Sequence, residues 1–97
     1  MIVILQSILP QEAQQPIYDI TLQIGAESFT FRVLCEVYII SDKPLTSVKM
    51  PSKLLDKINS NMFINSKINF IIHDWYKGNK INLPIILDDT ITSVYKR

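Results

Sequence analysis

Alternation of apolar and polar side chains between residues 17 and 40 constrains the fold of this chain more than any other feature. In IYDITLQI (17–24) and FTFRVLCEVYII (29–40), nearly every second side chain is apolar. Successive side chains of a β-strand point to opposite faces, so this pattern is typical of strands with one buried face. The connection at residues 25–28 is short and begins with Gly25, which predicts that the two strands pair as a hairpin.

Shorter patterns flank this hairpin on both sides. An apolar run at residues 2–5 predicts a strand that Pro10 ends. SDKPL (41–45) predicts a turn, because Ser and Asp open turns and Pro44 blocks continuation of a strand. A further short strand is expected at residues 46–50.

PSKLLDKINSN gives the clearest helical pattern of the chain. Pro51 and Ser52 suit a first helical turn, and the polar run at 59–61 suits an end. The sequence therefore predicts one short helix near 52–60. A helix of two or three turns is marginal by itself, so we expect packing against the sheet to stabilise it.

The segment 63–76 fits two interpretations. A helix would align an apolar stripe of Ile64, Ile68, Ile71, Ile72 and Trp75. A strand would place on one face Ile64, Ile68, Phe70 and Ile72. The segment lacks Ala, Glu and Leu and is rich in poor helix formers, which favours the strand.

Gly78-Asn79 is a two-residue turn signal, and it predicts a second hairpin that pairs residues on either side of it between 70 and 87. Pro84 cannot donate a ladder hydrogen bond, so its strand is expected at an edge. In this hairpin Trp75 and His73 project away from the buried face. If the segment is a helix instead, Trp75 joins the apolar stripe and becomes part of the core.

These elements predict an α+β fold, mainly an antiparallel β-sheet of two hairpins curled toward a small barrel, with one short helix near 52–60. At 97 residues, without repeats or a long linker, the chain is expected to form a single small globular domain over 1–97. TITSVYKR (90–97) fits either a last strand or a frayed tail.

Cysteine content and charge restrict the compartment and the partners. Cys35 is the only cysteine, so the fold needs no oxidising compartment, and we expect a cytoplasmic protein. No stretch approaches the roughly 20 apolar residues of a membrane span, which excludes the membrane as a partner. The net charge of +1 argues against a strong field for nucleic acid. The charge is unevenly distributed, since residues 1–42 are net acidic and residues 43–97 net basic.

The sequence offers little for catalysis, metal binding or a cofactor. His73 and Asp74 are adjacent, so their side chains diverge on a strand and on a helix alike, and they cannot act as a base and its orienting group. Cys35 lies within the apolar alternation, where cysteine usually acts as a small hydrophobic residue. One His and one Cys cannot supply the ligands of a zinc site. We therefore expect no enzyme activity, no metal and no cofactor.

The remaining candidate is a binding surface. It consists of Trp75, His73, Tyr76, Lys77 and Lys80. Aromatic side chains are enriched at protein interfaces, so we expect a small protein-interaction module (an adaptor, an inhibitor or an assembly subunit) that forms a homo-oligomer through a sheet edge or an apolar face. The alternative is a weak nucleic-acid-binding protein, in which bases stack on the aromatic rings and phosphates contact lysines.

Overall fold

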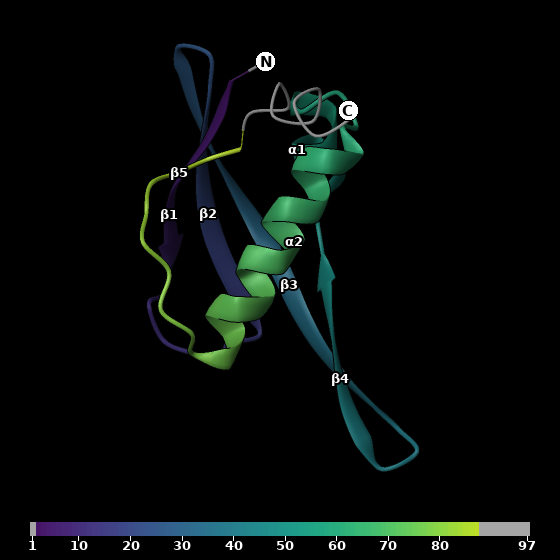
Figure 1. Ribbon diagram of the computed structural model, residues 1–97. Coiled ribbons are helices and arrows are strands. Elements are labelled where there is room, and N and C mark those ends of the chain that lie inside the picture. Colours follow the sequence, from purple (N-terminus) through teal and green to yellow (C-terminus); the bar gives the residue numbers. More distant parts are fainter. Residues whose placement is uncertain (1, 88–97) are drawn as a thin grey trace, which may run out of the picture.

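The computed structural model describes residues 2–87, which form a five-stranded sheet and two helices (Figure 1). The strands are β1 Val3–Leu9, β2 Ile17–Ile24, β3 Glu27–Ile40, β4 Lys43–Lys49 and β5 Ile85–Ile86. The helices are α1 Ser52–Lys57 and α2 Met62–Lys77. Neither helix is long and apolar enough to cross a membrane, within the part of the chain that the structure describes.

All neighbouring strands are antiparallel, in the order β4-β3-β2-β1-β5. The sheet curls into a half-barrel, which confirms the predicted α+β class with a mainly antiparallel sheet. The hairpin predicted between 17 and 40 is formed by β2 and β3, with Ile24 opposite Glu27 at the turn and Tyr18 opposite Val33. Gly25 in this turn has a φ of 63°, a left-handed conformation that glycine adopts without steric strain.

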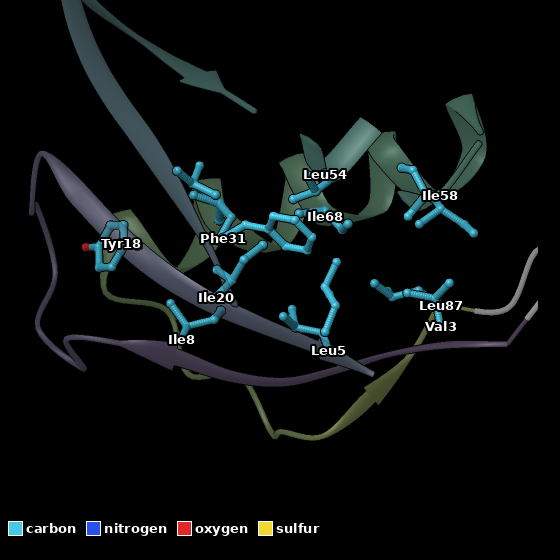
Figure 2. Close-up of a cluster of buried hydrophobic side chains, with 14 of the residues drawn as sticks. Val3, Leu5, Ile8, Tyr18, Ile20, Phe31, Leu54, Ile58, Ile68 and Leu87 are labelled. Carbon is cyan, nitrogen blue, oxygen red and sulfur yellow. The ribbon is translucent and has the colours of Figure 1, made fainter. Parts of the chain in front are cut away.

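The core lies between the concave face of the sheet and α2 (Figures 1 and 2). From α2, Ile64, Ile68 and Ile72 are completely buried, because positions four apart fall on one side of a helix. The buried strand residues are Val3, Leu5, Ile8, Tyr18, Ile20, Leu22, Phe31, Val33 and Cys35, and α1 adds Leu54. Cys35 therefore packs as a small hydrophobic residue, as its place in the alternation predicts.

The strand favoured at 63–76 is wrong, since α2 occupies this segment. Asn61 begins the helix by accepting a hydrogen bond of 3.0 Å from the Ile64 N–H. Gly78 ends it in the left-handed region with a φ of 86°, and its N–H donates to the carbonyl of Trp75. The residues interpreted as a hairpin turn thus form a C-terminal cap, for which glycine is equally suited.

The partner predicted for residues 81–87 is consequently wrong as well. β5 pairs with β1, with Leu5 opposite Ile85, and it forms an edge of the sheet, as Pro84 predicts. Residues 90–97, for which a last strand was considered, lie outside the described residues.

Two boundaries also differ from the prediction. The turn expected at 41–45 is confined to Ser41 and Asp42, and β4 already begins at Lys43. Pro44 is tolerated inside this strand because β4 is the other edge of the sheet. The short helix predicted near 52–60 is α1, which is followed by a break at Asn59 and Ser60, both with positive φ.

Candidate functional site

The paired ends of β3 and β4 project beyond α2 as a hairpin, which we call the arm and define as residues 36–47 (Figure 1, lower right). Its large apolar side chains are exposed, with exposed fractions of 47% for Val37, 45% for Tyr38, 76% for Ile39, 57% for Ile40 and 56% for Leu45. Apolar side chains therefore continue along the arm into a part of the sheet that α2 does not cover.

One side of the arm carries no charge, and we call it the uncharged face. It consists of Val37 and Ile39 on β3 and of Thr46 and Pro44 opposite them on β4. Because side chains alternate along a strand, Val37 and Ile39 point to the same side of the sheet as the buried Cys35. The uncharged face is thus a direct continuation of the core-facing surface.

The opposite side, the mixed face, carries Tyr38, Ile40 and Leu45 among charged side chains. Lys49 Nζ lies 2.8 Å from a carboxylate oxygen of Glu36, and the Tyr38 hydroxyl donates to the same carboxylate at 3.1 Å. The hydrogen bonds from Lys49 and then from Tyr38 lower the pKa of Glu36. The base of the arm is therefore held by a local polar network, while Ile40 and Leu45 nearer the tip face solvent.

The tip of the arm is a tight turn that keeps the two strands paired to their ends. Ser41 and Asp42 have φ angles of 52° and 63°, as in the two-residue turns that match the twist of a hairpin. Ile40 lies opposite Lys43 across this turn. The arm is consequently a regular ribbon up to its tip rather than a loop.

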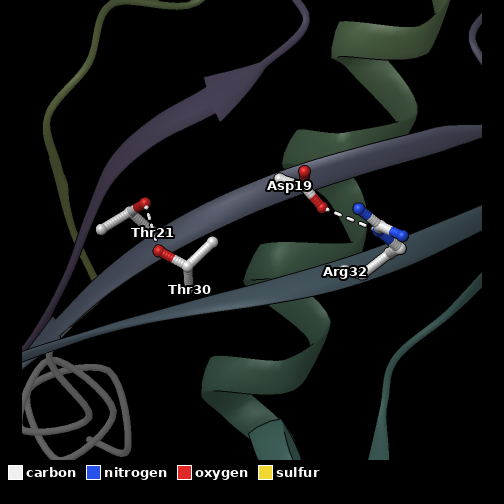
Figure 3. A network of polar contacts seen from close by, with 4 residues as sticks. All are labelled: Asp19, Thr21, Thr30 and Arg32. Atoms are coloured by element: carbon white, nitrogen blue, oxygen red, sulfur yellow. Dashed lines mark hydrogen bonds and ion pairs between the residues drawn. The ribbon is translucent and has the colours of Figure 1, made fainter.

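The convex side of the sheet carries polar pairs between β2 and β3 (Figure 3), beside the exposed apolar pair Ile17 and Leu34. Thr21 and Thr30 contact across β2 and β3 through hydroxyl groups 3.1 Å apart. On the same two strands Arg32 Nε donates to Asp19 Oδ1 at 3.1 Å. This part of the convex side is mostly polar, whereas the arm is a projecting part of the sheet with several exposed apolar side chains.

The five residues predicted as a binding surface do not come together. His73 and Lys77 line a hollow of about 490 Å³ on α2 beside Phe70, whose exposed fraction is 74%. Trp75 and Lys80 line a different hollow of about 360 Å³. Tyr76 lines neither of these two hollows and packs against the core.

Trp75 packs against the core, as the helical interpretation of its segment predicts. Its ring is half-buried and packs against the core, and its indole N–H donates to the carbonyl of Pro10 at 3.1 Å. The shared face of aromatic and lysine side chains, on which the nucleic-acid alternative depended, is therefore not formed. A binding role for each of these side chains separately remains a prediction.

Three titratable side chains, His73, Asp74 and Lys77, line the hollow on α2. Among residues 2–87 no three His, Cys, Asp or Glu side chains gather as metal ligands. Burial raises the pKa of the Cys35 thiol, which lowers its thiolate fraction and hence its reactivity.

Sequence reasoning missed the arm, although the sequence contains a signal for it. VYII (37–40) is a run of four apolar residues, and such a run places apolar side chains on both faces of a strand. A strand that is apolar on both faces has to be covered on both sides or exposed on at least one. How many residues of β3 are exposed depends on where α2 crosses this strand. The sequence pattern of β3 alone does not predict the position of α2.

Comparison with known proteins gives no independent guide to the function. No family model matches this chain, and no curated protein matches it.

Proposed function

We propose that this chain is a small non-catalytic protein-interaction module, acting as an adaptor, an inhibitor or a subunit of an assembly, and that it binds protein through the arm. The observation that carries the proposal is the exposure of Val37, Tyr38, Ile39, Ile40 and Leu45 on one projecting hairpin. Large contiguous apolar patches on a protein surface usually mark interaction sites.

The size of the patch supports this proposal. Taking about 200 Å² for a fully exposed large side chain, these five residues expose roughly 500 Å². This area is divided about equally between the two faces of the arm, so each face presents a patch near the lower end of the about 300–600 Å² of the largest patch on a typical monomer. Burying this apolar area would contribute about 12 kcal/mol to the free energy of binding. Association costs about 4–15 kcal/mol in lost translational and rotational freedom. A partner must therefore cover both faces of the arm to bind stably.

The compartment proposed for the module is the cytoplasm. Cys35 is free and buried, and it is the only cysteine of the chain. A chain with this cysteine content needs no disulfide to fold, as is usual in reducing compartments.

Site-specific photo-crosslinking in the producing cells tests the proposal. A photoreactive amino acid replaces Ile39 in one variant and Ala26 in a control, because Ala26 is also an exposed residue at a hairpin tip. We expect a crosslinked protein product from position 39 that is several-fold stronger than from position 26. The substitution Val37→Asp, on the same face as Ile39, should abolish it. Equal yields at the two positions, or none at position 39, would contradict the proposed function.

A further inference from the structure

We propose that the chain has a second interaction site, at which an extended acidic segment of another protein adds a strand to the edge of β3. The site is a hollow of about 500 Å³ between β3 and α1, which we call the α1 groove. It is lined by Phe29, Thr30 and Phe31 of the strand and by Lys53, Asp56 and Lys57 of the helix. This inference goes beyond the proposed function, because the α1 groove lies at the other end of β3 from the arm.

The edge of β3 in the α1 groove offers backbone hydrogen-bonding groups to a partner. Within the described residues β4 pairs with β3 only over residues 34–40, so the earlier part of β3 has no strand on that side. The N–H of Cys35 donates to the carbonyl of Pro16, next to β2, at 2.8 Å. Backbone groups of successive residues point to opposite edges of a strand, and the register between β2 and β3 is continuous. The N–H and C=O groups of Ser28 and Thr30 therefore point to the open edge, where an extended segment can pair with them.

Two aromatic rings form the apolar part of the α1 groove. The centroids of Phe29 and Phe31 are 6.2 Å apart, and both residues pack against the core. Phe29 is half-buried, whereas the exposed fraction of Phe31 is only 8%. Side chains of neighbouring strands at the same level point to the same face of a sheet, so an apolar side chain of the added strand contacts Phe29.

The charges of the α1 groove favour an acidic segment. Lys53 and Lys57 lie one helical turn apart on α1, and both are exposed. Neither lysine forms an ion pair within the described part of the chain. Two lysines against Asp56 leave the lining with a net charge of +1. Complementary charges of this kind favour Asp or Glu in the partner and act against Lys or Arg.

The same geometry favours a peptide over a nucleic acid. The Nζ of Lys57 lies 4.5 Å from the centroid of the Phe29 ring, and Phe31 lies beside that ring. These contacts leave little of either ring open for a base to stack on. Alternate side chains of a strand share a face, so we expect the bound segment to carry an apolar residue and an Asp or Glu two positions apart.

Selection from a phage-displayed library of random heptapeptides by the purified chain tests the inference. We expect enrichment of peptides with an apolar residue two positions from Asp or Glu. A fluorescein-labelled copy of the most enriched peptide then gives a Kd by fluorescence anisotropy. Lys53→Glu combined with Lys57→Glu should raise this Kd about tenfold or more. The matched control, Lys77→Glu combined with Lys80→Glu, also changes two exposed lysines and should leave the Kd unchanged.

Methylation of the peptide backbone separates strand addition from a contact between charges alone. Methyl groups on the amide nitrogens that face β3 each remove a donor, and each should raise the Kd about tenfold or more. Methylation of the alternate nitrogens, which face away from β3, should have a much smaller effect. Val37→Asp on the arm should leave the Kd unchanged.

Three results would overturn the inference. They are the absence of any enriched peptide, a Kd that is indifferent to the substitutions in α1 or to the position of the methyl group, and displacement of the peptide by an equal concentration of single-stranded oligo(dT). A crosslink at position 39 without peptide binding leaves the proposed function standing and removes the site at β3. Peptide binding without that crosslink has the opposite meaning.

Discussion

Tyr18 combines a buried ring with a hydrogen-bonded hydroxyl. Its ring is completely buried, while its hydroxyl donates to the carbonyl of Glu12 at 2.8 Å and accepts from the N–H of Gln15 at 3.2 Å. Tyr18→Phe leaves both backbone groups without this partner, so we expect a loss of about 1–2 kcal/mol in unfolding free energy.

Urea denaturation of Tyr18→Phe beside Tyr38→Phe checks this expectation. The Tyr38 hydroxyl donates to Glu36 on the surface of the arm, and its removal should change stability by less than about 0.5 kcal/mol. Equal effects of the two substitutions would show that the Tyr18 hydroxyl does not hold the loop between β1 and β2.

Two buried titratable groups make the stability of the fold sensitive to alkali. Burial raises the pKa of the Cys35 thiol, and burial is likewise the main cause that raises the pKa of Tyr18. The unfolded chain then loses these protons at lower pH than the folded chain. The unfolding free energy keeps its full value at pH values below about 8.5, the pKa of Cys in the unfolded chain. It decreases as the pH rises above this value, and decreases further above about 10, the pKa of Tyr in the unfolded chain.

Denaturation midpoints between pH 7 and pH 10.5 measure this loss. Cys35→Ala should remove the part of the decline that begins near the thiol pKa, although it also lowers stability at every pH by creating a cavity. A wild-type midpoint that is constant over the whole interval would contradict the prediction.

At the level of the element, α2 shows why composition misled. Its sequence contains many poor helix formers, yet one face of the sheet is apolar and has to be covered. α1, with six residues, is too short to do so. The three buried isoleucines of α2 gain more by packing on the sheet than the helix loses in propensity, as tertiary context often decides. Asn61 and Gly78 cap the helix, but both residue types are equally frequent in turns, which made the boundary signals ambiguous.

A pair of substitutions distinguishes the helix from the strand that the sequence favoured. Ile68→Ala should cost about 2–5 kcal/mol, because Ile68 is completely buried. Phe70→Ala should cost less than about 1 kcal/mol, since Phe70 is largely exposed in α2. In the hairpin interpretation Phe70 faces the core, and its truncation would cost about 3–5 kcal/mol. Urea denaturation measures both values.

At the level of the whole molecule, the arm should be separable from the core. Deleting residues 37–40 and 43–46 joins Glu36 and Ser47, which are already opposite each other, through the existing Ser41-Asp42 turn. No deleted residue is buried, so we expect an unfolding free energy within about 1 kcal/mol of the full chain.

Thermal unfolding followed by the emission of Trp75 tests this. Shortening the β2–β3 hairpin serves as a control. This change lies next to the partly buried Phe29 and should lower stability, because it removes core packing. A shortened arm that unfolds the protein would mean that the projecting strands support the core.

More of the fold than of the candidate site could be predicted from the sequence. Alternation along β2 and β3 marks which side chains face the core, and it identified Tyr18, Val33 and Cys35 correctly. The candidate site depends instead on relations between elements. Trp75 and Lys77 were grouped on one surface by the register of a hairpin, and the helix assigns them to different hollows. Ile39 is exposed because β3 is longer than the part of the sheet that α2 covers. The sequence of neither segment alone predicts this difference.

β3 is a single uninterrupted strand of 14 residues, and its two halves serve different purposes. At about 3.3 Å per residue, the five residues from Cys35 to Ile40 place the tip roughly 17 Å beyond the last buried side chain of that strand. The longer part of the strand, up to Cys35, is anchored in the core through Phe31, Val33 and Cys35. A force applied to the tip is therefore transmitted along continuous backbone into the packing around Tyr18, which lies opposite Val33.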